Sequence, residues 1–252
     1  MIEVRNLSKH FNDRNVLNNI SVSFETGKTS LIIGQSGSGK TVLIKCIVGL
    51  FEPDKGEILF DDIVFNRLNP KDKRNIRKDI GMLFQGSALF DSSTVEENVR
   101  FPLDMFTDMS NEEKRNRVNF CLKRVNIDNV NNLFPSELSG GMQKRVAIAR
   151  AIALNPRYLF CDEPNSGLDP KTSIVIDDLI KEITEEYNMT TVINTHDMNS
   201  VMGIGDKVVF IYNGEKEWEG NNKDILHSDN QFLNDFVFAS RIRKQLKTRM
   251  QN

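Results

Sequence analysis

The stretch from Leu31 to Leu50 constrains the fold of this chain more than any other. Leu31–Ile33 is an apolar run suited to a buried parallel strand, and Val42–Leu50 is predicted to form the following helix. Between them the sequence GQSGSGKT matches the phosphate-loop pattern G-x-x-x-x-G-K-[ST]. Its residues are Gly34, Gln35, Ser36, Gly37, Ser38, Gly39, Lys40 and Thr41. A strand, a glycine loop and a helix in this order predict an α/β fold with a phosphate site.

Each residue type in this loop has a chemical reason. Glycines let the backbone turn its N–H groups toward a phosphate, and the helix start adds further N–H groups and the positive end of the helix dipole. Lys40 supplies a mobile positive charge, and the Thr41 hydroxyl is a ligand for Mg²⁺. The alternative is a glycine-rich turn that binds nothing, which would need the lysine, the threonine and both flanking elements to coincide by chance. We therefore predict a nucleotide-binding loop.

Composition limits the class of protein. The chain has 252 residues with 39% hydrophobic and 27% charged residues, which is typical of a globular protein with a sizeable core. A net charge of −2 argues against nucleic acid as the partner, although a local basic patch stays open. The sequence has neither an apolar run long enough for a membrane span nor an apolar N-terminal signal region. We therefore expect any membrane role to be peripheral, on the cytoplasmic side.

The cysteines indicate a reducing compartment. Cys46, Cys121 and Cys161 are odd in number and show no CxxC spacing. Cys46 and Cys161 lie within apolar runs, so they are predicted to be buried thiols.

Polar side chains follow three apolar segments that read as strands. Gln85 follows Ile80–Phe84, and this glutamine either ligands Mg²⁺, positions water or merely caps a loop. Asp162 and Glu163 follow Tyr158–Cys161. In the same sheet as a phosphate loop, the Asp162 carboxylate is placed to hold Mg²⁺ through water. The neighbouring Glu163 is placed to polarise an attacking water.

His196 follows the apolar segment Thr191–Asn194, at the edge where open α/β sheets place their ligands. A histidine bonded within its own loop is the usual alternative, and its position at a strand end favours a functional role.

A second helix start resembles an anion site. Leu138, Ser139, Gly140 and Gly141 precede a predicted helix over Met142–Leu154, and Ser139 is a good N-cap residue. A well-capped helix without a ligand is the plain alternative. Residues 86–136 are predicted to be a mainly helical insertion, and residues 69–78 a solvated connection.

The two ends of the chain carry weaker signals. Phe11 lies in a polar loop, where it is either a satellite core aromatic or a ring that stacks on a purine base. The tail over residues 236–252 is basic and is predicted to be a solvated helix, with a membrane surface or a partner subunit as alternatives. Asn213-Gly214 predicts a β-hairpin turn.

Together these motifs resemble the ATP-binding cassette (ABC) ATPase family over about residues 2–220. GQSGSGKT resembles its Walker A motif, LSGGMQKRVAIARAI its signature, and residues 157–163 its Walker B motif with the catalytic glutamate. SGLDP at Ser166–Pro170 resembles its D-loop, Gln85 the Q-loop glutamine and His196 the switch histidine. Phe11 stands where many members have tyrosine, and Met142 where glutamine is commonest; neither departure removes a catalytic group.

The resemblance implies a fold and a site. The fold is α/β, a P-loop NTPase (RecA-like) ABC core with an antiparallel β subdomain and a helical subdomain at about residues 86–138, followed after residue 220 by a basic helical extension over residues 221–252. ATP and Mg²⁺ are the implied cofactors. Glu163, His196 and Gln85 are the implied catalytic residues, and Thr41, Gln85 and Asp162 the implied metal ligands. The implied nucleotide-binding residues are Phe11, Gly34, Gln35, Ser36, Gly37, Ser38, Gly39, Lys40, Thr41, Val42, Ser139, Gly140, Gly141 and Asp169.

The resemblance also implies partners. A second copy of the chain would close its signature over ATP held by the first, and integral membrane permease subunits would receive the motion. GQSGSGKTVLIKCIVGL, ALFDSSTVEENVRFPL and LSGGMQKR are similar to the ATPase of Mce-type (Mla-like) lipid transporters, which implies lipid cargo, an Mce-type lipid-binding partner and the cytoplasmic face of the inner (plasma) membrane.

Rival functions fit less well. Another importer-type transport ATPase shares much of the same sequence. A soluble, non-transport cassette is a second rival, but repair types carry long coiled coils and translation-factor types carry two cassettes, and neither pattern occurs here. A nucleotide sensor without catalysis would be expected to lack Glu163 or His196.

Overall fold

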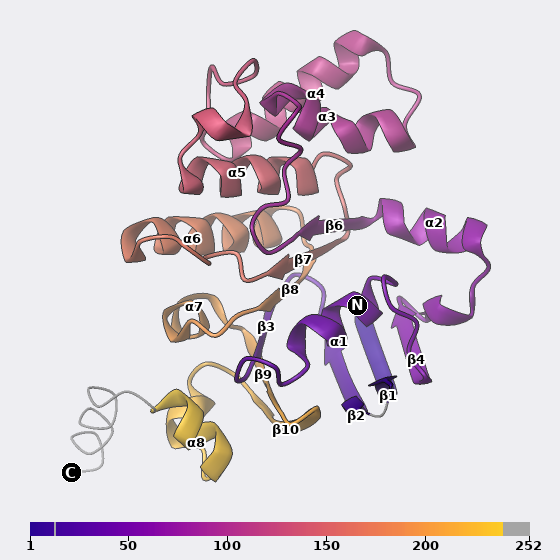
Figure 1. Ribbon diagram of the computed structural model, residues 1–252, viewed down its shortest axis with the longest axis vertical. Coiled ribbons are helices and arrows are strands. Elements are labelled where there is room, and N and C mark those ends of the chain that lie inside the picture. Colours follow the sequence, from indigo (N-terminus) through magenta and orange to yellow (C-terminus); the bar gives the residue numbers. More distant parts are fainter. Residues whose placement is uncertain (13, 239–252) are drawn as a thin grey trace.

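A six-stranded sheet forms the centre of the computed structural model, which describes residues 1–12 and 14–238 (Figure 1). Its strand order is β10-β9-β3-β8-β7-β6, and every neighbouring pair except β10–β9 is parallel. The strands are β3 (Thr29–Ile33), β6 (Ile80–Leu83), β7 (Tyr158–Asp162), β8 (Thr190–Asn194), β9 (Lys207–Tyr212) and β10 (Glu215–Gly220). Because the strands are parallel, the segments that follow β3, β6, β7 and β8 meet at one edge of the sheet.

A second sheet is antiparallel, with the order β2-β1-β4-β5. Its strands are β1 (Ile2–Phe11), β2 (Arg14–Phe24), β4 (Lys55–Phe60) and β5 (Ile63–Val64). We predicted a polar loop around Phe11, and this was wrong: pairing between the first two strands continues to Phe11 and Arg14. The last residues of β1 are exposed, so the alternation of apolar and polar residues that indicates a strand stops before the strand itself ends.

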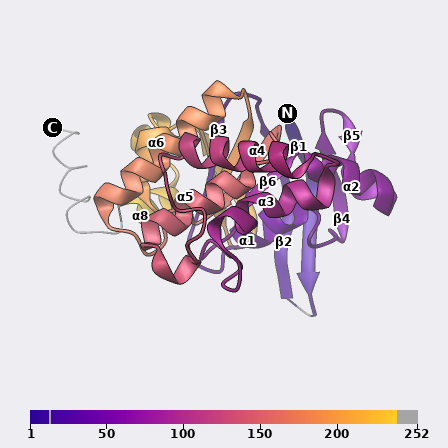
Figure 2. The same ribbon diagram turned by 90° about the horizontal axis from the view of Figure 1, so that it is seen from above.

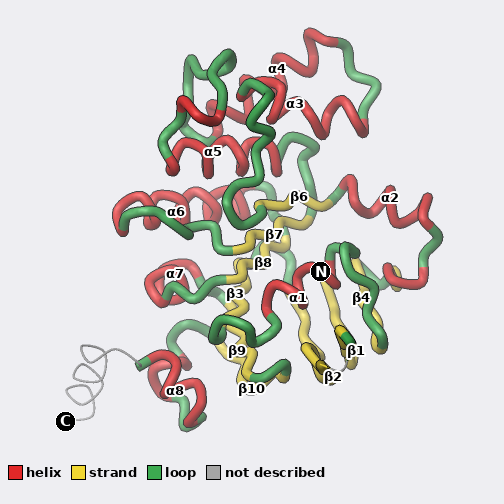
Figure 3. Tube along the Cα trace, in the orientation of Figure 1, coloured by secondary structure: helices red, strands yellow, loops and turns green. Residues whose placement is uncertain are grey.

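Helix α1 (Lys40–Ile47) packs in the core between the two sheets, and the helices that follow β6, β7, β8 and β10 belong to the core on the opposite face of the parallel sheet (Figure 3). The alternation along β3 shows how the two cores divide. Ile32 packs with α1 and the antiparallel sheet, whereas Leu31 and Ile33 pack with the helical side. All of β3 is therefore buried, as its continuous apolar run predicted.

The helical side contains most of the remaining helices. Helices α3 (Val95–Phe106), α4 (Asn111–Arg124) and α5 (Gly140–Ala151) pack on one another (Figure 2). Capping boxes begin the first two, with Thr94 and Glu97 on α3 and Ser110 and Glu113 on α4. The same side also contains α6 (Pro170–Glu186), α7 (Met198–Ile204), α8 (Gln231–Val237) and the short 3₁₀ turns Pro135–Glu137 and Asp224–His227. The 3₁₀ turn Phe65–Arg67 instead contacts β4, and Phe65 packs in the core with the antiparallel sheet.

Residues 69–78 are a helix rather than the solvated connection that we predicted. In α2 (Pro70–Lys78) the Asn69 side chain accepts a hydrogen bond of 3.0 Å from the Asp72 N–H, and Pro70 occupies the first turn. No residue of α2 is fully buried, although Ile76 packs against the core between the two sheets. The helix was missed because it has no apolar face to reveal its period.

Two smaller predictions can be compared with the structure. Cys46, Cys121 and Cys161 are buried free thiols, which confirms the burial predicted for two of them. Asn213 and Gly214, with φ of 47° and 81°, form the predicted hairpin turn between β9 and β10. Most of the predicted basic tail, residues 239–252, lies outside the described residues, and the domain boundary at residue 220 stays a prediction. Within the described ranges, no helix is long and apolar enough to cross a bilayer.

Candidate functional site

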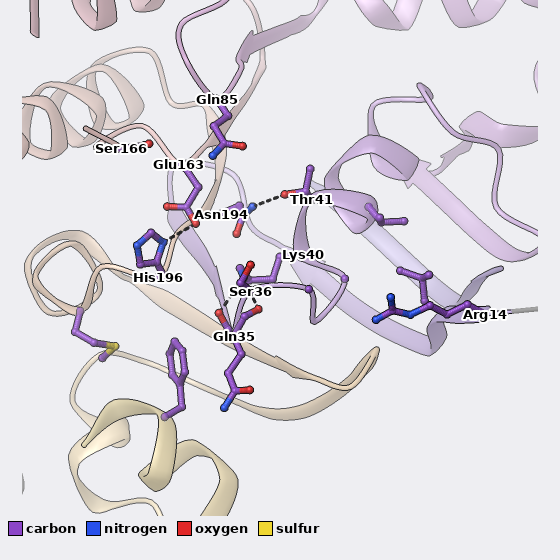
Figure 4. Close-up of a pocket in the computed structure, with 17 residues that line it drawn as sticks. Arg14, Gln35, Ser36, Lys40, Thr41, Gln85, Glu163, Ser166, Asn194 and His196 are labelled. Atoms are coloured by element: carbon purple, nitrogen blue, oxygen red, sulfur yellow. Dashed lines mark hydrogen bonds and ion pairs between the residues drawn. The ribbon is translucent and has the colours of Figure 1, made fainter. Parts of the chain in front are cut away.

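A cavity of about 690 Å³ opens at the edge where the parallel strands end (Figure 4). Its walls come from the glycine loop before α1, from the β1–β2 hairpin and from the segments after β6, β7 and β8. The predicted site residues that line it are Gly34, Gln35, Ser36, Gly37, Gly39, Lys40, Thr41, Val42, Gln85, Glu163 and His196. The fold thus brings together residues from across the sequence in one hollow.

The glycine loop is shaped to hold an anion. Gly39 precedes α1 with φ of 105°, and a Cβ there would lie 2.8 Å from the carbonyl oxygen of Val16. No side chain caps the start of α1, so its backbone N–H groups are open to a ligand. The helix begins at Lys40, two positions before the predicted start, which brings Lys40 and Thr41 into its first turn.

The Lys40 ammonium lies inside the loop. It donates hydrogen bonds of 2.8 Å to the Gly34 carbonyl and 3.0 Å to the Gln35 carbonyl. Burial lowers the pKa of Lys40, and the carboxylates of Glu163 and Asp162 oppose that shift. This arrangement holds a positive charge where the phosphates of a nucleotide would lie.

Thr41, Asp162 and Asn194 form a hydrogen-bonded cluster beneath the loop. The Thr41 hydroxyl donates to Asp162 Oδ1 at 3.3 Å, and the Asn194 amide donates to both Thr41 Oγ1, at 3.1 Å, and Asp162 Oδ1. Asn194 Oδ1 is buried without a hydrogen-bond partner among the described residues. Asn194 was not predicted as a site residue, although its place at the end of an apolar parallel strand was the available signal.

The oxygen atoms at this cluster fit Mg²⁺. A hydroxyl, a carboxylate and the amide of Gln85, which lines the same cavity, are the hard oxygen ligands that this ion prefers. In the described part of the chain, no group of three or more histidine, cysteine or acidic side chains forms a separate metal site.

Glu163 and His196 are in direct contact in the wall of the cavity (Figure 4). His196 Nδ1 lies 2.8 Å from Glu163 Oε1, and the Glu163 side chain is largely buried whereas His196 is exposed. Glu163 has a φ of 51°, and its N–H donates a hydrogen bond of 2.9 Å to the Asn194 carbonyl. A carboxylate held at a cavity edge can polarise a water, and the imidazole can contact a phosphate oxygen.

The residues of the second predicted anion site lie outside this cavity. Ser139 caps α5 as predicted, accepting a hydrogen bond of 3.3 Å from the Met142 N–H, and both Ser139 and Gly140 are exposed. Asp169 caps α6 and accepts hydrogen bonds from Thr172 and Lys171, which lower the pKa of Asp169. Among the described residues that line the cavity, none comes from the signature, so this chain alone does not bring the two motifs together.

Phe11 also does not line the cavity. Its ring packs edge-on against Phe51 with the centroids 5.3 Å apart, and Arg14 and Val16 of the same hairpin reach the hollow instead. Arg14 and Val16 share one face of β2 because strand side chains alternate, and this two-residue spacing could be seen in the sequence. Ser166, Met198 and Phe236 are further lining residues that were not predicted.

A buried carboxyl lies behind the site on α6. Asp177 is only 5% exposed, and burial raises its pKa from an ordinary 3.8 to about 6; Asp178 and Asp197 act in the same direction. Hydrogen bonds from Ser200 and Asn165 oppose that rise in the pKa of Asp177. The folded state therefore binds a proton more readily than the unfolded state between these two values, and stability falls as the pH rises through that range.

Comparison with known proteins identifies the family. A family model described as "ABC transporter" matches residues 17–166. A dimeric structure of the ATP-binding cassette MJ0796 with ADP and Pi superposes with a TM-score of 0.81 at 36% identity, covering 88% of this chain and 99% of that one. The chain therefore belongs to the ABC transporter family, as an ATP-binding cassette with the predicted P-loop NTPase fold.

Two relatives show the breadth of the family around this chain. The methionine import ATP-binding protein MetN of Clostridioides difficile is 38% identical over 94% of this chain and 74% of its own length. The intermembrane phospholipid transport system ATP-binding protein MlaF of Haemophilus influenzae is 40% identical over 94% of this chain and 90% of its own length. The chain is thus an ATPase coupled to transport, as predicted.

A Glu163→Gln variant tests the predicted role of this carboxylate. We expect it to bind ATP and to accumulate as a dimer, while turnover falls by about 100-fold or more because the amide cannot polarise water. Light scattering with ATP and steady-state phosphate release measure the two effects. Near-normal hydrolysis by the variant would remove Glu163 from the role.

An Asp177→Asn variant tests the buried carboxyl. The amide cannot ionise, so we expect the free energy of unfolding at about pH 8 to rise by on the order of 1–3 kcal/mol. The difference should shrink as the pH falls from about 6 and vanish only below about 3.8, where the wild-type carboxyl becomes protonated in both states. Urea unfolding of both proteins at several pH values measures it, and a difference independent of pH would contradict the shifted pKa.

Proposed function

We propose that this chain is the ATP-hydrolysing subunit of a lipid transporter of the Mce/Mla type. The observation that carries the ATPase part is the convergence of the glycine loop, Gln85, Glu163 and His196 on one cavity. The lipid part is supported by the local sequences quoted above and by the MlaF relative. An importer of another cargo is the second candidate, and the MetN relatives favour it.

In the proposed reaction the triphosphate of ATP lies on Gly37–Thr41 with its base toward the β1–β2 hairpin. Thr41, Gln85 and Asp162 would hold Mg²⁺, which when bound would neutralise charge on the phosphates. Glu163 polarises the attacking water and His196 contacts the γ-phosphate. These side chains act by position and charge, because phosphoryl transfer needs little covalent help from the protein.

The second half of the site would come from a second copy. Ser139 and Gly140 are exposed at the start of α5, outside the cavity of their own chain. Ser139 and Gly141 of one copy would then contact the γ-phosphate held by the other, so that ATP joins the two chains. The dimeric arrangement of the MJ0796 cassette supports this proposal.

The segment after Gln85 is the proposed contact with the permease. Phe90 is 42% exposed and stacks edge-on with the exposed Phe101 at 4.8 Å, which forms an apolar patch on the surface. The fully buried Asn98 of α3 accepts a hydrogen bond of 2.8 Å from the Phe90 N–H and donates one of 3.1 Å to its carbonyl. From α5, Arg150 donates to the carbonyls of Ala88 and Ser87, each at 2.8 Å.

These hydrogen bonds fix the segment after Gln85 to α3 and α5. Arg150 lies on α5, the helix that begins with the signature, and its guanidinium also lies 5.8 Å from the centre of the Phe90 ring. A movement of α5 on closure would therefore move the apolar patch with it. Such a patch suits an integral membrane subunit at the cytoplasmic face of the inner membrane.

Purification from detergent-solubilised membranes tests the function. We expect the chain to be isolated with an integral membrane subunit, and phospholipid to be the extractable cargo that stimulates hydrolysis when the complex is in liposomes. Stimulation by methionine and not by phospholipid would favour the importer. Failure to isolate any integral membrane subunit with the chain would support the soluble rival.

A Phe90→Ser variant tests the permease contact. Because Phe90 is away from the nucleotide cavity, we expect ATP binding to persist while co-purification of the membrane subunit is lost. Phe120→Ser is a matched control, since Phe120 is 47% exposed on the outer face of α4. Equal retention of the membrane subunit by both variants would place the contact elsewhere.

A further inference from the structure

The catalytic carboxylate is carried by a strained turn. Glu163 follows β7 directly with a φ of 51°, a left-handed conformation that is unfavourable for a residue with a side chain. Its carbonyl accepts a hydrogen bond of 3.2 Å from the Ser166 N–H, which closes a β-turn with Pro164 and Asn165 at its centre. Such a conformation persists only where the surrounding structure fixes it.

The side chain of Asn165 is the element that fixes this turn. Its amide nitrogen donates hydrogen bonds of 2.8 Å to Asp177 Oδ1 on α6 and 3.0 Å to Ser200 Oγ on α7. Both acceptors are buried, with exposed fractions of 5% and 1%. Both donors of one amide group are thus used, each on a different helix.

The two helices that Asn165 contacts follow the two residues of the catalytic pair, Glu163 and His196, along the chain. α6 begins after the D-loop that the turn leads into, and α7 begins after His196. The start of α7 is itself capped by Asp197, which accepts a hydrogen bond of 2.8 Å from the Asn199 N–H. Asn165 therefore ties the turn that begins at Glu163 to the helix that follows His196.

We propose that Asn165 is a positioning residue for hydrolysis, which holds Glu163 at its distance from His196 through Asp177 and Ser200. The 2.8 Å contact between the catalytic carboxylate and the imidazole depends on two separate loops, and this amide is a direct polar link between the helices that follow them. A side chain without an amide would leave the buried Asp177 carboxyl without this donor and the turn without its anchor.

This inference depends on the ATPase activity and not on the identity of the cargo. A positioning role and a purely structural role of Asn165 predict different effects on kcat. Loss of structure would reduce the folded fraction and hence the rate in proportion, whereas loss of position should reduce kcat in molecules that are folded and still bind ATP.

Kinetics of Asn165→Ala test the proposal on the full chain, with thermal unfolding measured in parallel. We expect kcat to fall by about 10- to 100-fold, with less than about a twofold change in KM for ATP, since a small misplacement of reacting groups has effects of this size. If this variant does not fold, Asn165→Ser carries the comparison, with an intermediate loss of kcat. Unfolding midpoints confirm that each assay is run where the variant is folded.

Asn66→Ala is the matched structural control. The Asn66 side chain also ties a turn, donating to the Gly56 carbonyl at 3.1 Å and accepting from the Ile58 N–H at 3.0 Å, but it lies in the antiparallel sheet region away from the cavity. We expect it to lower the unfolding midpoint while kcat stays within about twofold of wild type, because its hydrogen bonds support the fold alone.

An exchange of the two partners provides the rescue. Asn165→Asp alone would bring two carboxyl groups together, whereas Asn165→Asp combined with Asp177→Asn restores one amide and one carboxylate, so we expect kcat to recover at least partly in the double variant. The proposal is overturned if folded Asn165→Ala keeps the wild-type kcat, or if its rate falls only in proportion to the unfolded fraction. It is also overturned if Asn66→Ala loses kcat equally.

Discussion

The hydrogen-bonded cluster of Thr41, Asp162 and Asn194 is the interaction on which the rest of the site depends. Its members come from α1, β7 and β8, and Asp162 lies directly opposite Asn194 in the parallel register. A slip of one strand by one residue would turn its side chain to the other face of the sheet and so separate the pair. The buried pairing of the strands therefore fixes where the glycine loop lies relative to the carboxylates.

The same edge of the sheet explains why the site is incomplete in one chain. The strands deliver the loop, Gln85, Glu163 and His196 to one hollow, whereas α5 begins elsewhere with Ser139 exposed. A single copy thus carries a phosphate cradle and, on another surface, a capped helix start of the kind that binds anions. In the proposed function a second copy brings these two features onto one nucleotide, so that hydrolysis would depend on the approach of one chain to another.

Much of the fold and the site followed from the sequence because local pattern and chemistry agreed. The apolar strands and the loop between Gly34 and Thr41 carry strong local signals, and the structure brings the predicted residues from that loop, β6, β7 and β8 into one cavity. What the sequence did not show depends on contacts between distant segments. Asn194 and Asn165 gain their roles only from partners on other elements, and α2 has no apolar face. Phe11 was placed by motif position, yet its ring packs on Phe51 and leaves Arg14 at the hollow.

The order of the hydrolysis reaction in cassette concentration tests the central claim most directly. Initial rates are measured at saturating ATP, from concentrations at which the isolated chain is a dimer down to those at which light scattering shows monomers only. If one copy completes the site of another, the specific activity should fall toward zero as the chain becomes monomeric. A specific activity that stays constant in strictly monomeric samples would contradict the composite site.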